Sequence, residues 1–318
     1  MSFQNSWRPS TSINLLRQRA AILNQIRAFF NQRGYLEVET PAMASCGITD
    51  VYLSNIKAIF RNETYYLQTS PEYHMKRLLA AGSGPIFQMA KAYRDDEFGR
   101  YHNPEFTMLE WYQLDIDHHA LIQEVDELLQ VILGCPPAIR KTYQQLFMEV
   151  CALDPFTATI ADYRACLERF SLEYVLAADE KDADQYLFLL MSHIVEPSLA
   201  SSTAPVVVYD FPVSQAALAQ VNNDRAQRFE FYYGGMELAN GFHELLDVEK
   251  QRNRFEQDIA KRKALGLELP PIDPYFLAAL EHGLPACSGV ALGVDRMVML
   301  ALQQTDIAGV LSFDFSRA

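Results

Sequence analysis

Residues 93–112 read YRDDEFGRYHNPEFTMLEWY, two strand-like runs joined by a polar loop. Strand alternation places Phe106, Met108, Glu110 and Tyr112 on one face, and Arg94 ends the preceding run where the loop begins. A guanidinium there suits phosphate, because its planar fork donates two parallel hydrogen bonds and keeps its charge. Taken alone, the stretch also fits an exposed hairpin with that arginine paired to a nearby acid. The motifs that follow later in the sequence favour a nucleotide site.

Length and composition fit an enzyme with one large α/β core or two domains. The chain has 318 residues, of which 49% are hydrophobic. No apolar run approaches the roughly 18 residues of a membrane span, and the start MSFQNSWRPSTS does not resemble a signal peptide, so we expect no membrane contact and a cytoplasmic protein. The cysteines form no C-x-x-C pair, which predicts neither disulfides nor structural zinc.

The charge balance argues against a large nucleic-acid interface. The chain carries 40 acidic and 27 basic residues, a formal net charge of −13, which is a poor platform for a polyanion. A G-x-x-x-x-G-K-[ST] phosphate loop is absent from the sequence. Any nucleotide is therefore expected to bind through the strands.

Helix signals surround the strand motifs. Ser12 can cap a helix that ends near Gly34, and Ser70-Pro71-Glu72 supplies a capping serine and a proline in the first turn of another. From about residue 142 to 200 the sequence is mostly helix-like and lacks motif residues. We therefore expect a single domain over 1–318 with a helical insertion at about 142–200.

A second hairpin is expected near residue 234. RFEFYY (228–233) and MELANGF (236–242) flank Gly234-Gly235, which can adopt the positive φ angles of a two-residue turn. Alternation puts Glu237, Ala239 and Gly241 on one face, so Glu244 can join Glu237 only if the strand bulges at 240–241. Two such acids can hold Mg²⁺ against phosphate oxygens. The alternative is an exposed cross-strand acid.

The third motif, SGVALGVDRMVMLAL (288–302), joins a strand to a helix. Gly289, Ala291 and Gly293 leave one strand face almost bare, which clears it for a ligand, and Asp295 is expected to cap the helix. Arg296 can then lie over a base held on Phe106, a contact worth about 0.5–2 kcal/mol. A purely structural strand and helix is the alternative for this motif alone.

Three ordered segments resemble the signature motifs of class II aminoacyl-tRNA synthetases: Gly34–Pro41, Arg94–Phe106 and Gly289–Arg296. The strings SPEYHMKRLL, GRYHNPEFTMLEWY, ELANGFHEL and CSGVALGVDR resemble lysyl-tRNA synthetases and, more closely, a shortened paralogous family, the elongation factor P (R)-β-lysine ligases. The similarity covers essentially the whole chain. It implies an α/β (α+β) fold, with an antiparallel sheet flanked by helices, and a homodimer with the first motif at the interface.

The resemblance also implies an ATP site and an amino-acid pocket. The ATP site would use Arg94 for the α-phosphate, Asn103 for the adenine edge, Phe106 and Arg296 for its faces, Gly293 for clearance, and Asp95, Asp96 and Leu238 alongside. Glu237 and Glu244 would serve Mg²⁺ and the nucleotide and, with Arg94 and Arg296, form the catalytic set. The amino-acid pocket would comprise Ser70, Pro71, Glu72, Glu110, Tyr112, Glu244 and Ala291.

Two positions depart from lysyl-tRNA synthetases. Asp96 stands where the second motif has glutamate, so the shorter acid is expected to reach the nucleotide less well. Ala291 replaces a glycine, as in the shortened family. A methyl group in the pocket floor can change selectivity by about 1–3 kcal/mol.

The implied activity is ATP-dependent activation of (R)-β-lysine as an adenylate, followed by transfer to a lysine of elongation factor P. Only a short segment precedes the first expected helix, so no anticodon-binding domain is expected before the core, and with the acidic charge this argues against tRNA as acceptor. A minimal lysyl-tRNA synthetase and a catalytically silent paralogue that senses lysine or nucleotide are the alternatives.

Overall fold

The hairpin expected from residues 93–112 is present. Its strands are β5 (Ile86–Tyr93) and β6 (Glu105–Leu114), and Ala92 lies opposite Phe106. This computed structural model describes residues 7–95 and 98–318. Asp96, the departure from the family motif, therefore lies outside the described residues.

The chain divides into two compact units. The first contains the chain up to Asp117, residues 131–133 and residues 244–318, and the second contains residues 118–130 and 134–243. The interpretation as a single domain with an insertion at about 142–200 stays a prediction.

The first unit contains the strands that carry the second and third motifs. Its strand order is β1-β5-β6-β12, in which β1 (Leu36–Glu37) runs parallel to β5 and β12 (Cys287–Gly293) runs antiparallel to β6. The register places Gln88, Glu110 and Ala291 in one row across β5, β6 and β12. Directly opposed residues share a face of the sheet, so this row brings an acid beside the pocket-floor alanine.

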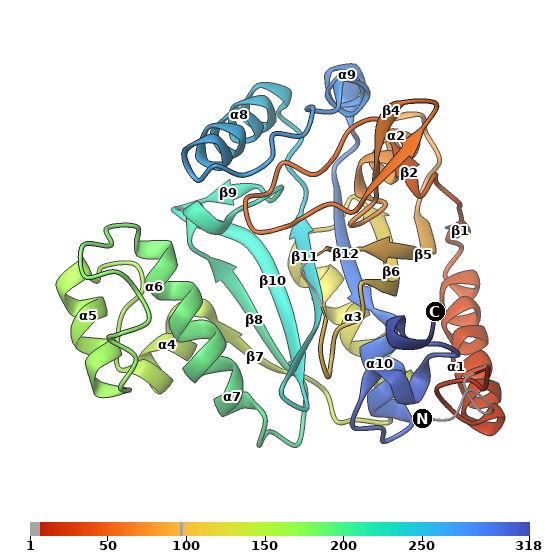
Figure 1. Ribbon diagram of the computed structural model, residues 1–318, viewed down its shortest axis with the longest axis horizontal. Coiled ribbons are helices and arrows are strands. Elements are labelled where there is room, and N and C mark those ends of the chain that lie inside the picture. The colour runs from red at the N-terminus through yellow and green to blue at the C-terminus, as the bar shows by residue number, and fades with distance from the viewer. Residues whose placement is uncertain (1–6, 96–97) are drawn as a thin grey trace. The chain divides into compact units, whose positions relative to one another are not determined.

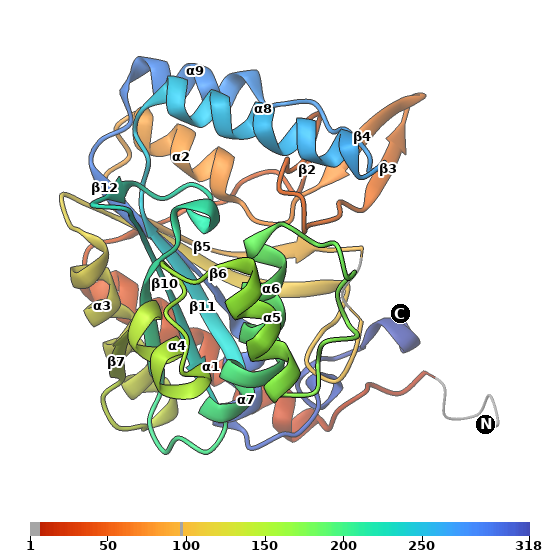
Figure 2. The ribbon, with the colours of Figure 1, turned by 90° about the vertical axis from the view of Figure 1, so that its left-hand side faces the viewer.

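Helices and a small second sheet complete the first unit. The small sheet has the order β2-β4-β3. In Figures 1 and 2, α2, α8 and α9 lie together. The elements are α1 (Ile13–Gln32), β2 (Met43–Ala44), β3 (Lys57–Phe60), β4 (Glu63–Leu67), α2 (Glu72–Ala80), α8 (Val248–Ala264), α9 (Pro274–Gly283), α10 (Val294–Ala301) and the 3₁₀ turns η4 (Ile307–Val310) and η5 (Phe315–Arg317).

Aromatic packing attaches the first helix to the sheet. The Phe30 ring of α1 stacks on Phe87 of β5 with centroids 4.6 Å apart, and it meets Trp111 of β6 edge-on at 5.2 Å. All three side chains are buried. Ser12 caps the helix as expected, since its hydroxyl accepts a hydrogen bond from the Leu15 amide. The hairpin thus sits on a rigid support.

The second unit combines a sheet with a group of helices, and the strand order is β11-β10-β8-β7 with β9 paired to β10. Residues 143–199 are largely helical, as the sequence indicates, and α4 to α7 lie together in Figure 2. The elements are α3 (His118–Leu133), β7 (Ile139–Thr142), α4 (Tyr143–Cys151), α5 (Ile160–Arg169), α6 (Ala183–Leu190), the π turn η2 (Met191–Val195), α7 (Glu196–Leu199), β8 (Val206–Phe211), the 3₁₀ turn η3 (Val213–Gln215), β9 (Val221–Asn222), β10 (Arg225–Tyr233) and β11 (Met236–His243).

The turn at Gly234-Gly235 is confirmed, with φ angles of 60° and 76°, but the bulge lies elsewhere than expected. Glu237 pairs with Tyr232 while Ala239 pairs with Phe231, so the extra residue is Leu238 and not part of the 240–241 step. A bulge reverses the alternation beyond it. The prediction that Glu237 and Ala239 share a face is therefore wrong.

The predicted fold class is confirmed. The two units contain mostly antiparallel strands flanked by helices, with parallel pairing only of β1 with β5 and of β7 with β8 among the described strand pairs. Within residues 7–95 and 98–318, none of the helices combines the length and the apolar character that a bilayer span requires.

Candidate active site

The first wall of the amino-acid pocket is built on Glu110. Strand β6 presents Glu110 and Tyr112 on one face, and the segment that enters α2 brings Ser70 to them. The Ser70 hydroxyl donates to Glu110 Oε2 at 2.7 Å, and the Tyr112 hydroxyl donates to Glu110 Oε1, also at 2.7 Å. Three residues that the sequence assigned to one pocket therefore meet.

The Glu110 carboxyl group is almost fully enclosed, with 2% of its surface exposed. Burial, reinforced by the negative charge of Glu72, raises the pKa of Glu110 to about 8, although the hydroxyls of Tyr112 and Ser70 oppose the shift. Both of its direct side-chain partners are neutral donors. Below about pH 8 the empty pocket therefore holds Glu110 protonated, and a cation that enters would favour loss of that proton.

The second wall contains a cation that the sequence analysis missed. Lys76 Nζ lies 2.6 Å from Glu72 Oε1 and 2.6 Å from Glu244 Oε2. Lys76 and Glu244 each expose 1% of their side chains, whereas Glu72 exposes 16%. The available signal was the spacing of Glu72 and Lys76, four residues apart on a helix.

The charges of this second wall stabilise one another. Burial alone would lower the pKa of Lys76, but the carboxylates of Glu244 and Glu72 outweigh it and raise that pKa well above its ordinary value. Burial raises the pKa of Glu244 to about 7, and Lys76 limits this rise. Lys76 therefore stays an ammonium ion inside the protein.

The helix start at Ser70-Pro71-Glu72 differs in detail from the expected cap. Pro71 is the N-cap residue of α2 and makes no side-chain capping bond. The Ser70 hydroxyl accepts a hydrogen bond from the Glu72 amide at 3.0 Å while it donates to Glu110. One hydroxyl therefore connects the helix start to the Glu110 wall.

Strand β12 forms the pocket floor. A Cβ atom on Gly289 would lie 2.2 Å from Tyr112 Cε1 and 2.6 Å from Glu244 Oε1. The space at this glycine is thus filled by two pocket side chains and not left clear for a ligand. Gly293 differs, since its nearest neighbour would be Arg296 Cδ at 3.7 Å. Ala291 lies opposite Glu110 and is partly exposed.

A pocket opens beside the second wall. Among its lining residues are Ala44, Cys46, Gln68, Ser70, Glu72 and Asp273. Of Glu72, Glu110 and Glu244, only Glu72 lines this pocket. Glu72 is therefore the carboxylate that the second wall presents to an incoming molecule.

Three of the predicted nucleotide residues, Arg94, Asp95 and Asn103, lie between β5 and β6, and Phe106 lies on β6. The Arg94 guanidinium sits over the Phe106 ring, with Cζ 5.2 Å from the centroid. Arg296 instead donates to the Tyr101 carbonyl at 3.3 Å and lies 2.6 Å from His102 Nε2. Asp95 follows Arg94, and its amide donates to the Ser54 carbonyl. Arg94 therefore lies over the Phe106 ring, and a position of Arg296 over a base held on Phe106 stays a prediction.

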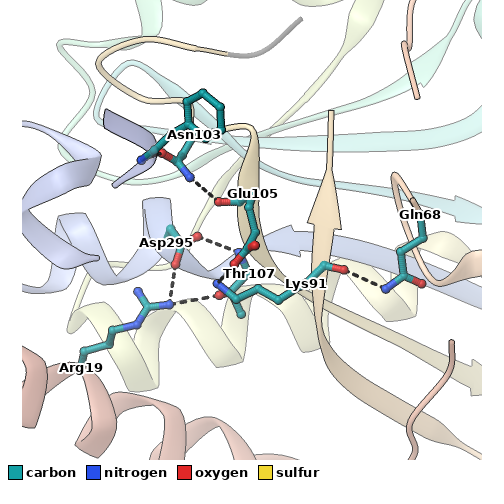
Figure 3. Close-up of polar contacts among 8 residues, drawn as sticks. Arg19, Gln68, Lys91, Asn103, Glu105, Thr107 and Asp295 are labelled. Atoms are coloured by element: carbon teal, nitrogen blue, oxygen red, sulfur yellow. Dashed lines mark hydrogen bonds and ion pairs between the residues drawn. The ribbon is translucent and has the colours of Figure 1, made fainter. Parts of the chain in front are cut away.

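Asn103 and Asp295 hold the loop in place (Figure 3). The Asn103 amide nitrogen donates to the Glu105 carbonyl at 2.6 Å, and its oxygen accepts from the Phe315 amide at 2.9 Å. Asp295 does not cap α10, because the helix begins at Val294 with Gly293 as its N-cap. Its carboxylate instead accepts from the Thr107 amide at 2.7 Å and from Arg19 at 2.5 Å. The prediction of a cap is wrong.

A polar face in the second unit surrounds Glu237. The bulge at Leu238, which is itself buried, places Glu237 opposite Tyr232 and Asn240 opposite Glu230. Glu230 forms an ion pair with Arg228 and accepts a hydrogen bond from Tyr232, and Arg228 also donates to Asn240 at 3.2 Å. The sequence analysis missed Glu230, although an acid within the aromatic run RFEFYY was a visible signal.

Glu237 and Glu244 were expected to hold Mg²⁺, and their surroundings make them unequally suitable as ligands. In the described part of the chain, no group of three or more His, Cys, Asp or Glu side chains is arranged to hold a metal ion. Mg²⁺ takes few protein carboxylates and keeps phosphate oxygens and water in its shell. Glu237 is partly exposed and shares its face with Glu230. Glu244 suits the ion poorly, because its buried carboxylate is already paired with the Lys76 ammonium.

Comparisons with known proteins show the family of this chain. The family model of class II tRNA synthetases (D, K and N) matches residues 5–317. A protein of Vibrio vulnificus (strain YJ016) named elongation factor P--(R)-beta-lysine ligase is 52% identical over 321 residues, which cover 98% of this chain and 99% of that protein. Proteins of the same name from Edwardsiella ictaluri (strain 93-146) and Haemophilus influenzae (strain PittGG) are each 50% identical, with 100% of both chains covered.

Proposed function

The chain belongs to the class II tRNA synthetases (D, K and N), and from that membership we propose that it is an ATP-dependent ligase that attaches (R)-β-lysine to a lysine of elongation factor P. The full-length relatives that carry this name support the proposal. The observation on which the choice of substrate rests is the pair of acidic pocket walls around Glu110 and Glu72.

The pocket chemistry suits an amino acid with two ammonium groups. A buried carboxylate is costly unless a cation or several donors compensate it, and Glu110 has only hydroxyl partners among its direct side-chain contacts. A substrate ammonium group would supply the missing charge. Glu72 is the second seat and, with Ser70, lines the pocket, while Pro71, Tyr112, Glu244 and Ala291 complete the proposed amino-acid site.

The proposed reaction has two steps that balance. A carboxylate oxygen of (R)-β-lysine attacks the α-phosphorus of ATP, the bond to the β-phosphate oxygen breaks, and pyrophosphate leaves. The unprotonated amine of the acceptor lysine then attacks the acyl carbon, so an amide forms, AMP leaves and the amine releases a proton. Neither step needs a side-chain nucleophile, because positioning and charge stabilisation supply the catalysis.

Each nucleotide residue has a role in this proposal. Arg94 binds the α-phosphate, Phe106 and Arg296 enclose the adenine, Asn103 reads its edge, and Gly293 leaves room for the ribose and phosphates. Membership of the family implies ATP as the nucleotide. Mg²⁺, held by Glu237, would neutralise phosphate charge.

We further propose a homodimer with the Gly34–Pro41 motif at its interface, and a cytoplasmic location beside the acceptor. An exposed apolar side chain within this motif supports the dimer, since Leu36 is 53% exposed. Acceptance of a protein in place of tRNA agrees with the formal charge of −13.

Intact-mass spectrometry tests the proposed function. The protein is incubated with ATP, Mg²⁺, (R)-β-lysine and purified elongation factor P, and the factor should gain the mass of one lysyl group. A reaction without ATP serves as the control. An unchanged mass of the factor contradicts the proposal, and charging of tRNA with α-lysine under the same conditions would favour a minimal lysyl-tRNA synthetase.

A further inference from the structure

We infer that Lys76 is a positioning residue that makes the pocket selective for a diamino acid, because it holds Glu72 in place and balances the charge of the second wall. This inference rests on the proposed function and extends it to a residue outside the predicted site. Lys76 is a cation and cannot pair with a substrate ammonium group, so it acts through Glu72, whose Oε1 it contacts at 2.6 Å.

The contacts of Lys76 form a continuous path from the floor of the pocket to its opening. The Glu244 amide donates to the Cys287 carbonyl of β12 at 3.0 Å, and the Gly289 backbone donates to the Glu244 carboxylate. Lys76 Nζ joins Glu244 to Glu72 through two contacts of 2.6 Å. Glu72 is thereby linked to the sheet through Oε1, and its side chain also lines the pocket.

Lys76 is surrounded by groups from several elements. Its ammonium lies 5.7 Å from the ring centroid of Phe276 on α9, which favours a cation. The titratable side chains that face it from α2, from the segment after β11, from β6 and from β12 are Glu72, Glu244, Glu110 and Cys287. Among these groups Lys76 is the single cation.

The charges of the pocket match the activated substrate. Glu72, Glu110 and Glu244 supply carboxylates and Lys76 supplies one ammonium, so the pocket lacks two positive charges when all four groups are ionised. Once its carboxylate is joined to AMP, (R)-β-lysine offers two ammonium groups. An acid with one amine leaves a buried carboxylate unpaired, which is strongly unfavourable.

Amino-acid-dependent pyrophosphate exchange tests the inference. We compare wild type, K76M and K141M, a control with the same substitution in a surface ion pair of the second unit. The substrates are (R)-β-lysine and 3-aminohexanoic acid, which lacks the distal amine. K76M should raise the KM for (R)-β-lysine at least ~tenfold. Its preference for (R)-β-lysine over 3-aminohexanoic acid should fall at least ~tenfold, and its KM for ATP should change less than about twofold. K141M should match wild type.

A double-mutant cycle separates positioning from simple packing. If Lys76 acts by fixing Glu72, E72Q should raise the KM for (R)-β-lysine much less in the K76M background than in wild type. Additive effects of the two substitutions, or unchanged discrimination in K76M, would overturn the inference. If K76M does not fold, K76M/E244Q removes the buried pair together and should show the same loss of discrimination.

The two proposals fail in different ways. A wild-type protein without exchange on any lysine isomer contradicts the proposed function. Normal exchange by the wild type, together with a K76M variant that keeps the wild-type KM and discrimination, contradicts only the role of Lys76.

Discussion

The two acidic walls of the pocket use the same residue type and hold it in different ways. Glu110 is held by the hydroxyl groups of Ser70 and Tyr112, whereas Glu72 and Glu244 are held by the ammonium of Lys76. Glu110 and Glu244 are equally buried, to within a percentage point. The difference between the walls therefore lies in the charge of their partners and not in their exposure to water.

This difference assigns the walls separate tasks. Neutral donors orient a carboxylate without cancelling its charge, so Glu110 keeps a demand for a cation that a substrate can meet. An internal ammonium cancels charge and fixes geometry, so the second wall is largely preformed. The Glu110 wall should dominate the affinity for substrate, and the Lys76 wall should dominate its selectivity.

Removing the charge of Glu110 should have the largest effect. E110Q keeps the shape of the side chain but loses the carboxylate that pairs with the substrate ammonium, so kcat/KM for (R)-β-lysine should fall about 100-fold or more. The KM for ATP should stay within about twofold of wild type. Steady-state pyrophosphate exchange measures both.

E105Q is the matched control for this prediction. Glu105 lies on the same strand and forms an exposed ion pair with Lys91, and such pairs contribute little. Should E110Q retain wild-type kcat/KM, the Glu110 wall would not be the seat of the substrate ammonium and the comparison between the walls would break.

The pH dependence of stability should separate the walls next. An unfolded glutamate titrates near ~4.3, and the pKa of Glu110 in the folded protein is about 8. Between these values the unfolded chain releases the proton while the folded protein keeps it, so the free energy of unfolding falls as pH rises. E110Q lacks this group. Between about pH 4 and pH 8, the free energy of unfolding of E110Q should therefore rise relative to that of the wild type, by on the order of 1–3 kcal/mol.

Urea unfolding of wild type and E110Q at several pH values measures this difference. The pKa of Glu244 is raised only to about 7, because Lys76 opposes the effect of burial. The fall in the free energy of unfolding that Glu244 causes as pH rises should therefore end at a lower pH than the fall caused by Glu110. Added (R)-β-lysine should reduce the pH dependence of the wild type, because its ammonium favours the Glu110 carboxylate. If the free energy of unfolding depended on pH in the same way in wild type and E110Q, a raised pKa of Glu110 would be contradicted.

The sequence encodes the Glu110 wall more openly than the Lys76 wall. Glu110 and Tyr112 follow the alternation of one strand, Ser70 belongs to a recognisable helix start, and the family resemblance implies that all three belong to one pocket. Lys76 looks like the partner of an ordinary surface pair with Glu72. Its burial depends on Glu244 and Phe276, which are distant in the chain.

The errors elsewhere have the same physical origin. Asp295 was expected to satisfy the start of its own helix, but it bonds the Thr107 amide, 188 residues away. The extra residue at Leu238 is set by how β10 and β11 pair, which the alternation of either strand alone does not reveal. Periodicity predicts elements and their faces well, whereas long-range polar partners depend on tertiary packing.

The smallest predicted effect concerns the Tyr112 hydroxyl. It tests whether the loss of a neutral donor changes substrate discrimination less than the loss of the Lys76 ammonium. Y112F removes only the hydroxyl that donates to Glu110 at 2.7 Å, and one neutral hydrogen bond contributes about 0.5–1.5 kcal/mol. The KM for (R)-β-lysine should therefore rise only about two- to tenfold, and the preference over 3-aminohexanoic acid should persist, because the Glu110 carboxylate remains and Ser70 still orients it. Exchange assays on Y112F and K76M in parallel measure both quantities. A loss of discrimination in Y112F as large as that in K76M would mean that hydroxyl and ammonium partners serve these carboxylates in the same way.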